Sequence, residues 1–130
     1  MTQALTPPRI LIVEDDYVVG LALESGLREA GFDVAGIATS AEEAVDIAQS
    51  ARPTLAIMDI RLHGRRTGID AAIDMFATAG TRCIFASAHH GPDIELRAAR
   101  ATPLGWVAKP YQINTVVVQI QRALEELRGA

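Results

Sequence analysis

Three acidic residues, a serine and a lysine each stand at the end of a short apolar segment of this chain. They are Glu14, Asp15, Asp59, Ser87 and Lys109. A carboxylate nucleophile beside further carboxylates and a lysine suits phosphoryl transfer, because a cation can neutralise the charge on the transferred group. Close carboxylates also repel each other unless a cation lies among them. These residues are therefore the candidate site.

The apolar segments that precede the candidate residues predict the strands of a parallel sheet. They are short and rich in β-forming residues, and helical patterns lie between them, which is typical of alternating βα units. Ligands gather at the carboxyl ends of such strands, so the candidate residues are expected to meet at one edge. The predicted strands cover residues 10–13, 32–37, 55–58, 83–86 and 105–108.

Capping signals and apolar periodicity predict five helices. Asp16 is the expected N-cap of the first helix, which stops at Gly31, and the segment Ser40–Glu43 opens the second as a capping box. The third helix covers about 69–79, the fourth about 92–101 and the last 112–127. The inward stripe expected on the last helix consists of Ile113, Val117, Ile120, Leu124 and Leu127.

Composition predicts one globular domain. The chain has 130 residues, of which 49% are hydrophobic and 22% charged, enough to bury a core. We expect a disordered lead-in over residues 1–8, because Thr6-Pro7-Pro8 is compatible with neither helix nor ladder, and a domain over 9–128.

Charge and cysteine content indicate the compartment and exclude some partners. The net charge of -4 and the pI of about 5.3 argue against direct binding of nucleic acid. One cysteine, Cys83, with no signal peptide and no apolar run of membrane-spanning length, favours a cytoplasmic protein with no membrane contact.

The order of these motifs resembles the receiver domain of two-component response regulators, from Arg9 to Leu127. The landmarks are Ile10-Leu11-Ile12-Val13-Glu14-Asp15-Asp16, Met58-Asp59-Ile60, Ser87-Ala88 and Val107-Ala108-Lys109-Pro110. Each landmark alone is a weak signal, whereas all four in this order are a strong one. The resemblance implies an α/β fold, a doubly wound, flavodoxin-like (βα)5 sheet of five parallel strands in the order 2-1-3-4-5.

The resemblance also implies a phosphorylation site that depends on Mg²⁺. Asp59 would accept a phosphoryl group from a phosphohistidine. Asp15 and Asp59 would bind the Mg²⁺ ion directly, together with the backbone carbonyl of Arg61, and Glu14 would act through a metal-bound water. This ligand set agrees with the preference of Mg²⁺ for oxygen ligands.

Four other positions take their expected roles from the same resemblance. Ser87 and Lys109 would bind the phosphoryl oxygens, and Pro110 would follow a cis peptide bond. Trp106 occupies the aromatic switch position, which is usually Tyr or Phe; because an indole is larger, the rotamer switch of the family is open to question here.

Arg61 and His89 are expected to tune the lifetime of the acyl phosphate. In receivers, the residues two beyond the phosphoacceptor and two beyond the hydroxyl residue flank the attacking water. The loop 61–68 also lacks the usual proline, is slightly longer than usual and carries three arginines. It is either a solvated basic loop or a site of partner recognition.

The expected partners are a histidine kinase or phosphotransfer protein and a downstream protein target that the sequence does not name. The output surface would be formed by the fourth helix, the fifth strand and the fifth helix, and the same surface could instead bind a second copy of the chain.

Val116 and Val118 are expected beside the inward stripe of the last helix, where they would form an exposed apolar patch or be scattered valines. A stand-alone regulator, a phosphate sink and a receiver within a longer protein all remain open.

Three other functions are compatible with parts of this pattern. An aspartyl-phosphate phosphatase usually carries a second Asp two residues after the nucleophile, where this chain has Arg61. A flavin or nucleotide carrier needs a phosphate cradle after the first strand, where Glu14-Asp15-Asp16 would repel phosphate. A pseudo-receiver that binds partners without phosphorylation requires a defective site, and this site is complete.

Overall fold

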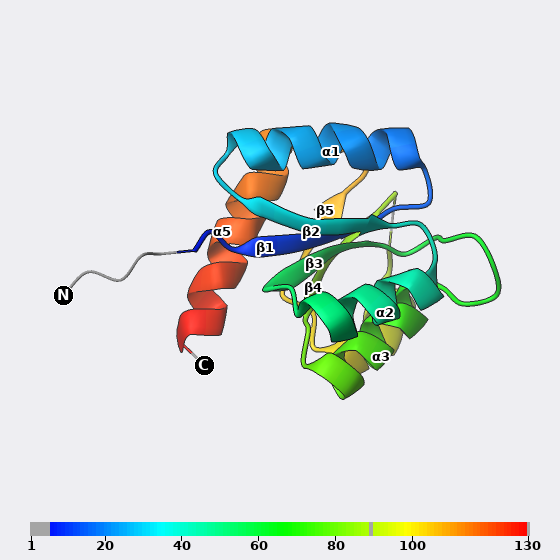
Figure 1. The fold of residues 1–130 in the computed structure, drawn as a ribbon. Helices are drawn as coiled ribbons and strands as arrows, with labels where there is room; N and C mark the ends of the chain where they lie inside the picture. The colour runs from blue at the N-terminus through cyan, green and yellow to red at the C-terminus, as the bar shows by residue number, and fades with distance from the viewer. Residues whose placement is uncertain (1–5, 89, 130) are drawn as a thin grey trace.

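The computed structural model describes residues 6–88 and 90–129, built around a sheet of five parallel strands (Figure 1). The strand order β2-β1-β3-β4-β5 confirms the predicted order and the doubly wound α/β class. The strands are β1 (Arg9–Val13), β2 (Asp33–Ala38), β3 (Leu55–Asp59), β4 (Cys83–Ser87) and β5 (Gly105–Ala108).

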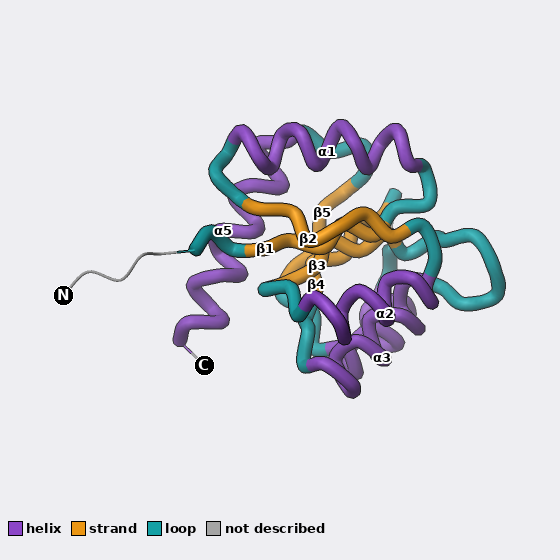
Figure 2. Tube along the Cα trace, viewed as in Figure 1, coloured by secondary structure: helices purple, strands orange, loops and turns teal. Residues whose placement is uncertain are grey.

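Helices cover both faces of the sheet. The first face is covered by α1 (Tyr17–Glu29) and α5 (Ile113–Gly129). The second face is covered by α2 (Ala41–Ala51), α3 (Gly68–Ala79) and α4 (Pro92–Ala98). Helix α4 continues into the 3₁₀ helix η1 (Ala99–Ala101). Figure 2 shows the sheet between these two helical layers. Because both faces are covered, the interiors of the central strands are continuously apolar and do not alternate with polar residues.

The strand pleat divides β1 between two cores. Leu11 and Val13 pack with α2 and α3, whereas Ile10 and Ile12 pack with α1 and α5, and all four side chains are buried. Successive side chains of a strand point to opposite faces. This two-sided burial fixes the register of β1, so the acidic residues that follow it are held at one edge.

The predicted N-terminal capping box of α2 is only half formed. Ser40 Oγ accepts the N–H of Glu43 at 3.2 Å, as expected, but the Glu43 carboxylate accepts the N–H of Thr39 at 2.8 Å rather than that of Ser40. A complete capping box occurs instead at the start of α3, between Thr67 and Asp70. The sequence pattern indicates the start of a helix but not which flanking N–H the carboxylate reaches.

The inward face of α5 differs from the predicted stripe. Its buried residues are Val116, Ile120 and Ala123, while the other predicted residues of the stripe pack partly buried beside them. The expectation that Val116 is exposed is therefore wrong, since its exposure is 0%, whereas Val118 is 44% exposed.

The boundaries of other elements differ by one to a few residues, as helix and strand ends often do. The second strand begins and ends one residue later than predicted, and the fourth helix tightens into η1 for its last turn. Of the predicted lead-in, residues 1–5 lie outside the described residues. Within the rest, the Pro8 carbonyl accepts the N–H of Asp33 at 2.9 Å, which ties this segment to the start of β2.

Candidate functional site

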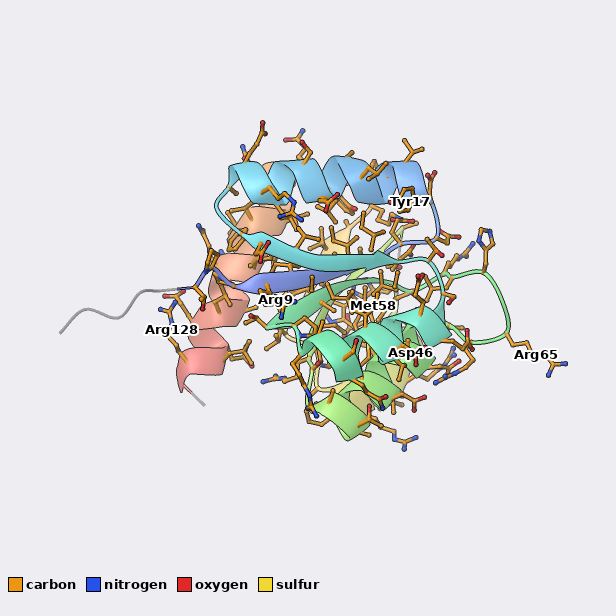
Figure 3. All side chains as sticks on the ribbon, viewed as in Figure 1. Arg9, Tyr17, Asp46, Met58, Arg65 and Arg128 are labelled. Atoms are coloured by element: carbon orange, nitrogen blue, oxygen red, sulfur yellow. The ribbon has the colours of Figure 1, made fainter. Side chains whose placement is uncertain are left out.

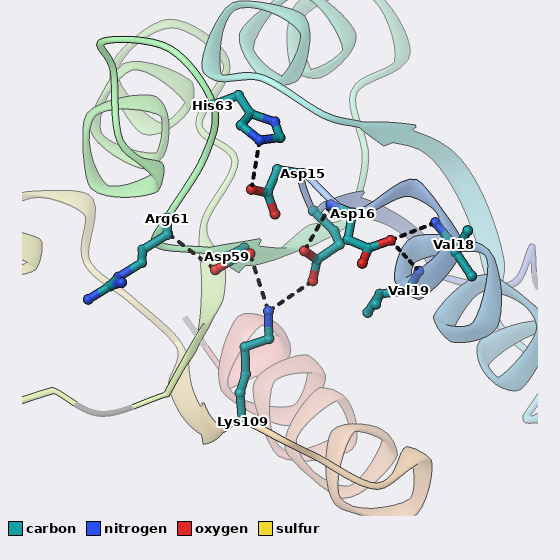
Figure 4. Close-up of polar contacts among 9 residues, drawn as sticks. Asp15, Asp16, Val18, Val19, Asp59, Arg61, His63 and Lys109 are labelled. Atoms are coloured by element: carbon teal, nitrogen blue, oxygen red, sulfur yellow. Dashed lines mark hydrogen bonds and ion pairs between the residues drawn. The ribbon is translucent and has the colours of Figure 1, made fainter.

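The parallel sheet brings the predicted site residues to one edge (Figure 4). Glu14 and Asp15 follow β1, Asp59 ends β3, Ser87 ends β4 and Lys109 follows β5. In the sheet register, Val13 pairs with Met58, Asp59 with Ala86, and Ser87 with Ala108. The ends of these strands are therefore level, and Asp15, Asp59, Ser87 and Lys109 line one cavity of about 840 Å³.

Three carboxylates form the centre of the site. Glu14, Asp15 and Asp59 each offer an oxygen, and these oxygens all lie within 4.8 Å of one another. Glu14 and Asp59 are buried, whereas Asp15 is partly exposed. All three donors are oxygens, which is the ligand chemistry of Mg²⁺ rather than of softer metals.

Lys109 places an ammonium group between two of the carboxylates. Its Nζ lies 3.1 Å from Glu14 Oε1 and 3.2 Å from Asp59 Oδ2. Burial alone would lower the pKa of Lys109, but the hydrogen bond to Glu14 and the charges of both carboxylates outweigh this effect and raise it. The lysine is therefore charged at neutral pH. The Lys109-Pro110 bond that follows is cis, as predicted.

Glu14 is the carboxyl group with the most strongly altered acidity. The pKa of Glu14 is raised from 4.5 to about 7, chiefly by burial and also by the neighbouring Asp59 carboxylate. The hydrogen bond from Lys109 and that from the Asp16 N–H, which donates to Glu14 Oε2 at 3.2 Å, act in the opposite direction. Half-protonation near neutral pH makes Glu14 responsive to any cation that enters the cluster.

Asp59 is oriented by its own loop as well as by the lysine. Asp59 Oδ1 accepts the backbone N–H of Arg61 at 3.2 Å. Figure 4 shows the Arg61 guanidinium pointing away from the Asp59 carboxylate. The side chain of Arg61 therefore does not cover the carboxylate here, and its predicted roles in metal binding and in lifetime stay predictions.

Ser87 and Trp106 lie on the α4 side of the site. Ser87 is buried and lines the cavity. The Trp106 ring is 4.9 Å from that of Phe85 and stacks on that of His90 at 4.3 Å. His89, predicted to flank the attacking water, lies outside the described residues.

Sequence reasoning missed three side chains near the site. His63 Nε2 lies 3.7 Å from Asp15 Oδ2, His90 stacks on Trp106, and the partly buried Tyr111 has a pKa raised by burial and by the Glu14 charge. Tyr111 follows the lysine and proline, so its place at the edge was a usable signal. The histidines lie in loops whose course no periodicity fixes.

Asp16 has the structural role that was predicted for it. Its Oδ1 accepts the N–H groups of Val18 and Val19 at 3.1 and 3.3 Å, which caps α1. It does not belong to the group of three carboxylates. A capping carboxylate interacts favourably with the positive end of the helix dipole, so an acidic residue at this position is explained without a role in the site.

The fold and site together define a class: a doubly wound α/β domain with an acidic cluster and a lysine at the carboxyl edge of its sheet. The sequence matches the response regulator receiver domain family over residues 10–121. The chain belongs to this family and is a receiver domain of two-component signalling.

Relatives and solved structures agree with this assignment. The chain is 33% identical over 125 residues to the transcriptional regulatory protein PdtaR of Mycobacterium tuberculosis, covering 96% of this chain and 60% of that protein. It is 37% identical over 116 residues to the phyllosphere-induced regulator PhyR of Methylorubrum extorquens, covering 88% and 43%. The chain thus spans about half the length of these relatives.

Among solved structures, the chain is similar to the signal receiver domain of a modulated diguanylate cyclase from Desulfovibrio desulfuricans G20. The TM-score is 0.84 at 33% identity, and the alignment covers 93% of this chain and 96% of that one. In the described part of the chain, no helix has the length and apolarity needed to cross a membrane.

Proposed function

We propose that Asp59 accepts a phosphoryl group from a phosphohistidine and that the resulting acyl phosphate controls the binding of partner proteins. The observation that carries this proposal is the group of three carboxylates, with oxygens within 4.8 Å, contacted by the Lys109 ammonium. Close like charges destabilise a fold unless they hold something, so the cluster is best explained by function.

The transfer is an in-line displacement at phosphorus. An oxygen of the ionised Asp59 carboxylate attacks the phosphorus atom, an O–P bond forms, and the P–N bond to the donor imidazole breaks. The electron pair of that bond stays on the imidazole nitrogen, which is neutral after a proton is taken from water. The backbone N–H of Arg61 holds one carboxylate oxygen, which orients the nucleophile.

Glu14, Asp15 and Asp59 would hold Mg²⁺, with the Arg61 carbonyl as a further oxygen ligand and Glu14 acting through water. The donor set is entirely oxygen, which fits this ion. When bound, Mg²⁺ supplies positive charge to the carboxylates and to the transferred group.

Lys109 and Ser87 would bind the phosphoryl oxygens. The Lys109 ammonium is already in contact with Asp59 Oδ2, so a small movement of its long side chain brings it to an oxygen of the attached group. Ser87 shares the same cavity and would donate its hydroxyl to another oxygen. Both residues would thus be sensitive to the state of Asp59.

The proposal includes the partners and the compartment predicted from the sequence. The donor would be a histidine kinase or a phosphotransfer protein, and a protein target would read the phosphorylated state at the α4–β5–α5 surface. A cytoplasmic location agrees with the free, buried thiol of Cys83, since cytoplasmic thiols are kept reduced. Arg61 and His89 would set the acyl-phosphate lifetime from the rim.

The test is incubation with Mg²⁺ and acetyl phosphate, followed by intact mass measurement over time. Wild-type protein should gain one phosphoryl group, and Asp59→Asn should gain none while keeping its fold. Asp93→Asn is the matched control, because Asp93 lines the same cavity but lies outside the carboxylate cluster. Full labelling of Asp59→Asn would refute the assignment.

A further inference from the structure

The loop between β3 and α3, residues 60–67, carries a cluster of positive charge, of which the proposed function uses only Arg61. It contains Arg61, Arg65 and Arg66 and no acidic residue, in a chain whose net charge is -4. Three of the eleven arginines of the chain therefore lie within eight residues. We call this segment the basic loop.

The base of the basic loop is fixed by several contacts. The Gly68 N–H donates to the Ile60 carbonyl at 2.7 Å, and the Thr67–Asp70 capping box closes the start of α3. Arg66 forms an ion pair with Asp74 on the outer side of α3. One of the three arginines is thus paired with an acid, and the loop is held at both ends.

The remaining charges of the basic loop are uncompensated. Neither the Arg61 nor the Arg65 side chain makes a hydrogen bond or ion pair within the described ranges 6–88 and 90–129, and both are exposed. Figure 3 shows Arg65 projecting from the molecule at the end where the strands finish, with Arg128 at the opposite end.

The cavity beside the basic loop is itself unfavourable for an anion. Among the residues that line it, Asp15, Asp59 and Asp93 are acidic, and the buried Glu14 lies behind them, whereas Lys109 is already shared between two carboxylates. Phosphodonors carry negative charge, so these carboxylates repel them wherever no cation neutralises the cluster. Positive charge at the rim would reduce this repulsion without occupying the reacting centre.

We propose that the basic loop is an electrostatic steering surface, which raises the rate at which anionic phosphodonors reach the cleft, with Arg65 and Arg61 as its charges. The inference rests on the proposed phosphorylation of Asp59. Electrostatic steering changes the rate at which a donor reaches the cleft and leaves the rate of phosphoryl transfer unchanged. Its effect therefore depends on charge and ionic strength and not on a contact with the phosphoryl group. Steering therefore favours phosphodonors of higher negative charge over those of lower negative charge.

The test compares charge variants at the two ends of the molecule. Phosphorylation rates are measured by mass at saturating Mg²⁺ with acetyl phosphate, a dianion near neutral pH, and with phosphoramidate, which carries less negative charge. At the lowest ionic strength that the Mg²⁺ and phosphodonor salts permit, we expect Arg65→Ala to slow labelling by acetyl phosphate about threefold and Arg65→Glu about tenfold. The effects should be smaller with phosphoramidate and vanish in about 0.5 M salt.

Arg128→Ala and Arg128→Glu are the matched controls, since they change the net charge equally at the far end of the molecule. Their rates should equal that of the wild type, and all variants should unfold at similar temperatures. Equal rates for the Arg65 and Arg128 variants would overturn the inference, as would an Arg65 effect that persists at high salt. Failure of the wild type to be labelled would instead refute the proposed function.

Discussion

At the scale of single residues, Glu14 determines how the site responds to pH. Its side chain is 4% exposed, and its carboxylate contacts Lys109 at 3.1 Å. Since the pKa of Glu14 is raised to about 7, chiefly by burial, the group is only partly ionised at neutral pH when no cation is added. A bound cation would favour ionisation of Glu14 and release its proton.

This raised pKa predicts that stability falls as pH rises without metal. The folded protein keeps the Glu14 proton between pH 4.5 and about 7, where the unfolded chain has already lost it. The unfolded state then binds fewer protons, so the free energy of unfolding decreases through this interval, by at most about 3 kcal/mol. Urea unfolding of wild type and Glu14→Gln at pH 5 and pH 8 measures the effect.

Glu14→Gln should be nearly as stable as the wild type at pH 5 and more stable at pH 8 without Mg²⁺, with the difference reduced by Mg²⁺. Lys109 does not affect this comparison. Its raised pKa stabilises the fold at every pH below 10.5, its ordinary pKa, and this stabilisation is lost only as pH rises through the higher pKa of the folded state. Glu42→Gln, on the exposed side of α2, should follow the wild type. A stability difference that is independent of pH would contradict the prediction.

The residues that sequence could predict are those fixed by strand ends. Glu14, Asp15, Asp59 and Lys109 come together because each follows or ends a strand whose place in the sheet is predictable. His63 could not be found this way, since it reaches Asp15 through an irregular loop. Strand register carries information about the site, whereas the path of a loop depends on contacts that no sequence period encodes.

At the scale of elements, the start of α3 lies against the end of β3. A Cβ added at Gly68 would lie 1.9 Å from the Asp59 carbonyl oxygen and 2.9 Å from the Ile60 Cα. Both are backbone atoms that cannot rotate away. The glycine therefore permits the close approach of helix and strand that positions the nucleophile and the base of the basic loop.

Gly68→Ala should be destabilised by roughly 1–3 kcal/mol, the usual cost of overpacking, and should also be phosphorylated more slowly because Asp59 must shift. Urea unfolding and acetyl phosphate labelling measure the two effects. Gly36→Ala is the control, because a Cβ there would make only an ordinary contact of 3.5 Å with Ile47. Wild-type stability of Gly68→Ala would show that the two elements separate without cost.

Most elements were predictable because their apolar patterns are strong, while the contacts at their ends were not. The apolar pattern of α5 predicted a helix but placed its inward face one residue away from Val116, because the consecutive valines 116–118 put apolar side chains on several sides of the helix. The Thr67–Asp70 capping box was likewise hidden inside a polar loop. Periodicity defines the type of an element, and local packing defines its rotation.

At the scale of the whole molecule, Trp106 joins the site to the α4–β5–α5 surface. It lies between Phe85 of β4 and His90 of the loop that leads to α4, and His90 Nε2 is 2.9 Å from Glu95 Oε2 on α4. The two helices of this surface carry exposed apolar side chains, Leu96 of α4 at 77% and Val118 of α5 at 44%. A change at Ser87, three residues before His90, is thereby connected to α4 through an aromatic stack.

This connection predicts a fluorescence response from the single tryptophan of the chain. Beryllofluoride with Mg²⁺, a mimic of phosphorylated Asp59, should change Trp106 emission, because the two states of the surface must differ in their contacts with the phosphoryl group if it is to shift their populations. His90→Ala should raise the basal emission by removing the stacked imidazole and should weaken the response. NMR shifts of Leu96 and Val118 provide a second readout.

Glu95→Gln separates the stack from the ion pair, since it removes the charge that faces His90 and leaves the ring contact with Trp106. If the stack carries the coupling, Glu95→Gln should respond to beryllofluoride almost as the wild type does, whereas His90→Ala should not. Equal responses in the wild type and His90→Ala would show that Trp106 senses the site through Phe85 and β4 alone. Shifts confined to the Asp59 cavity would exclude this surface as the output.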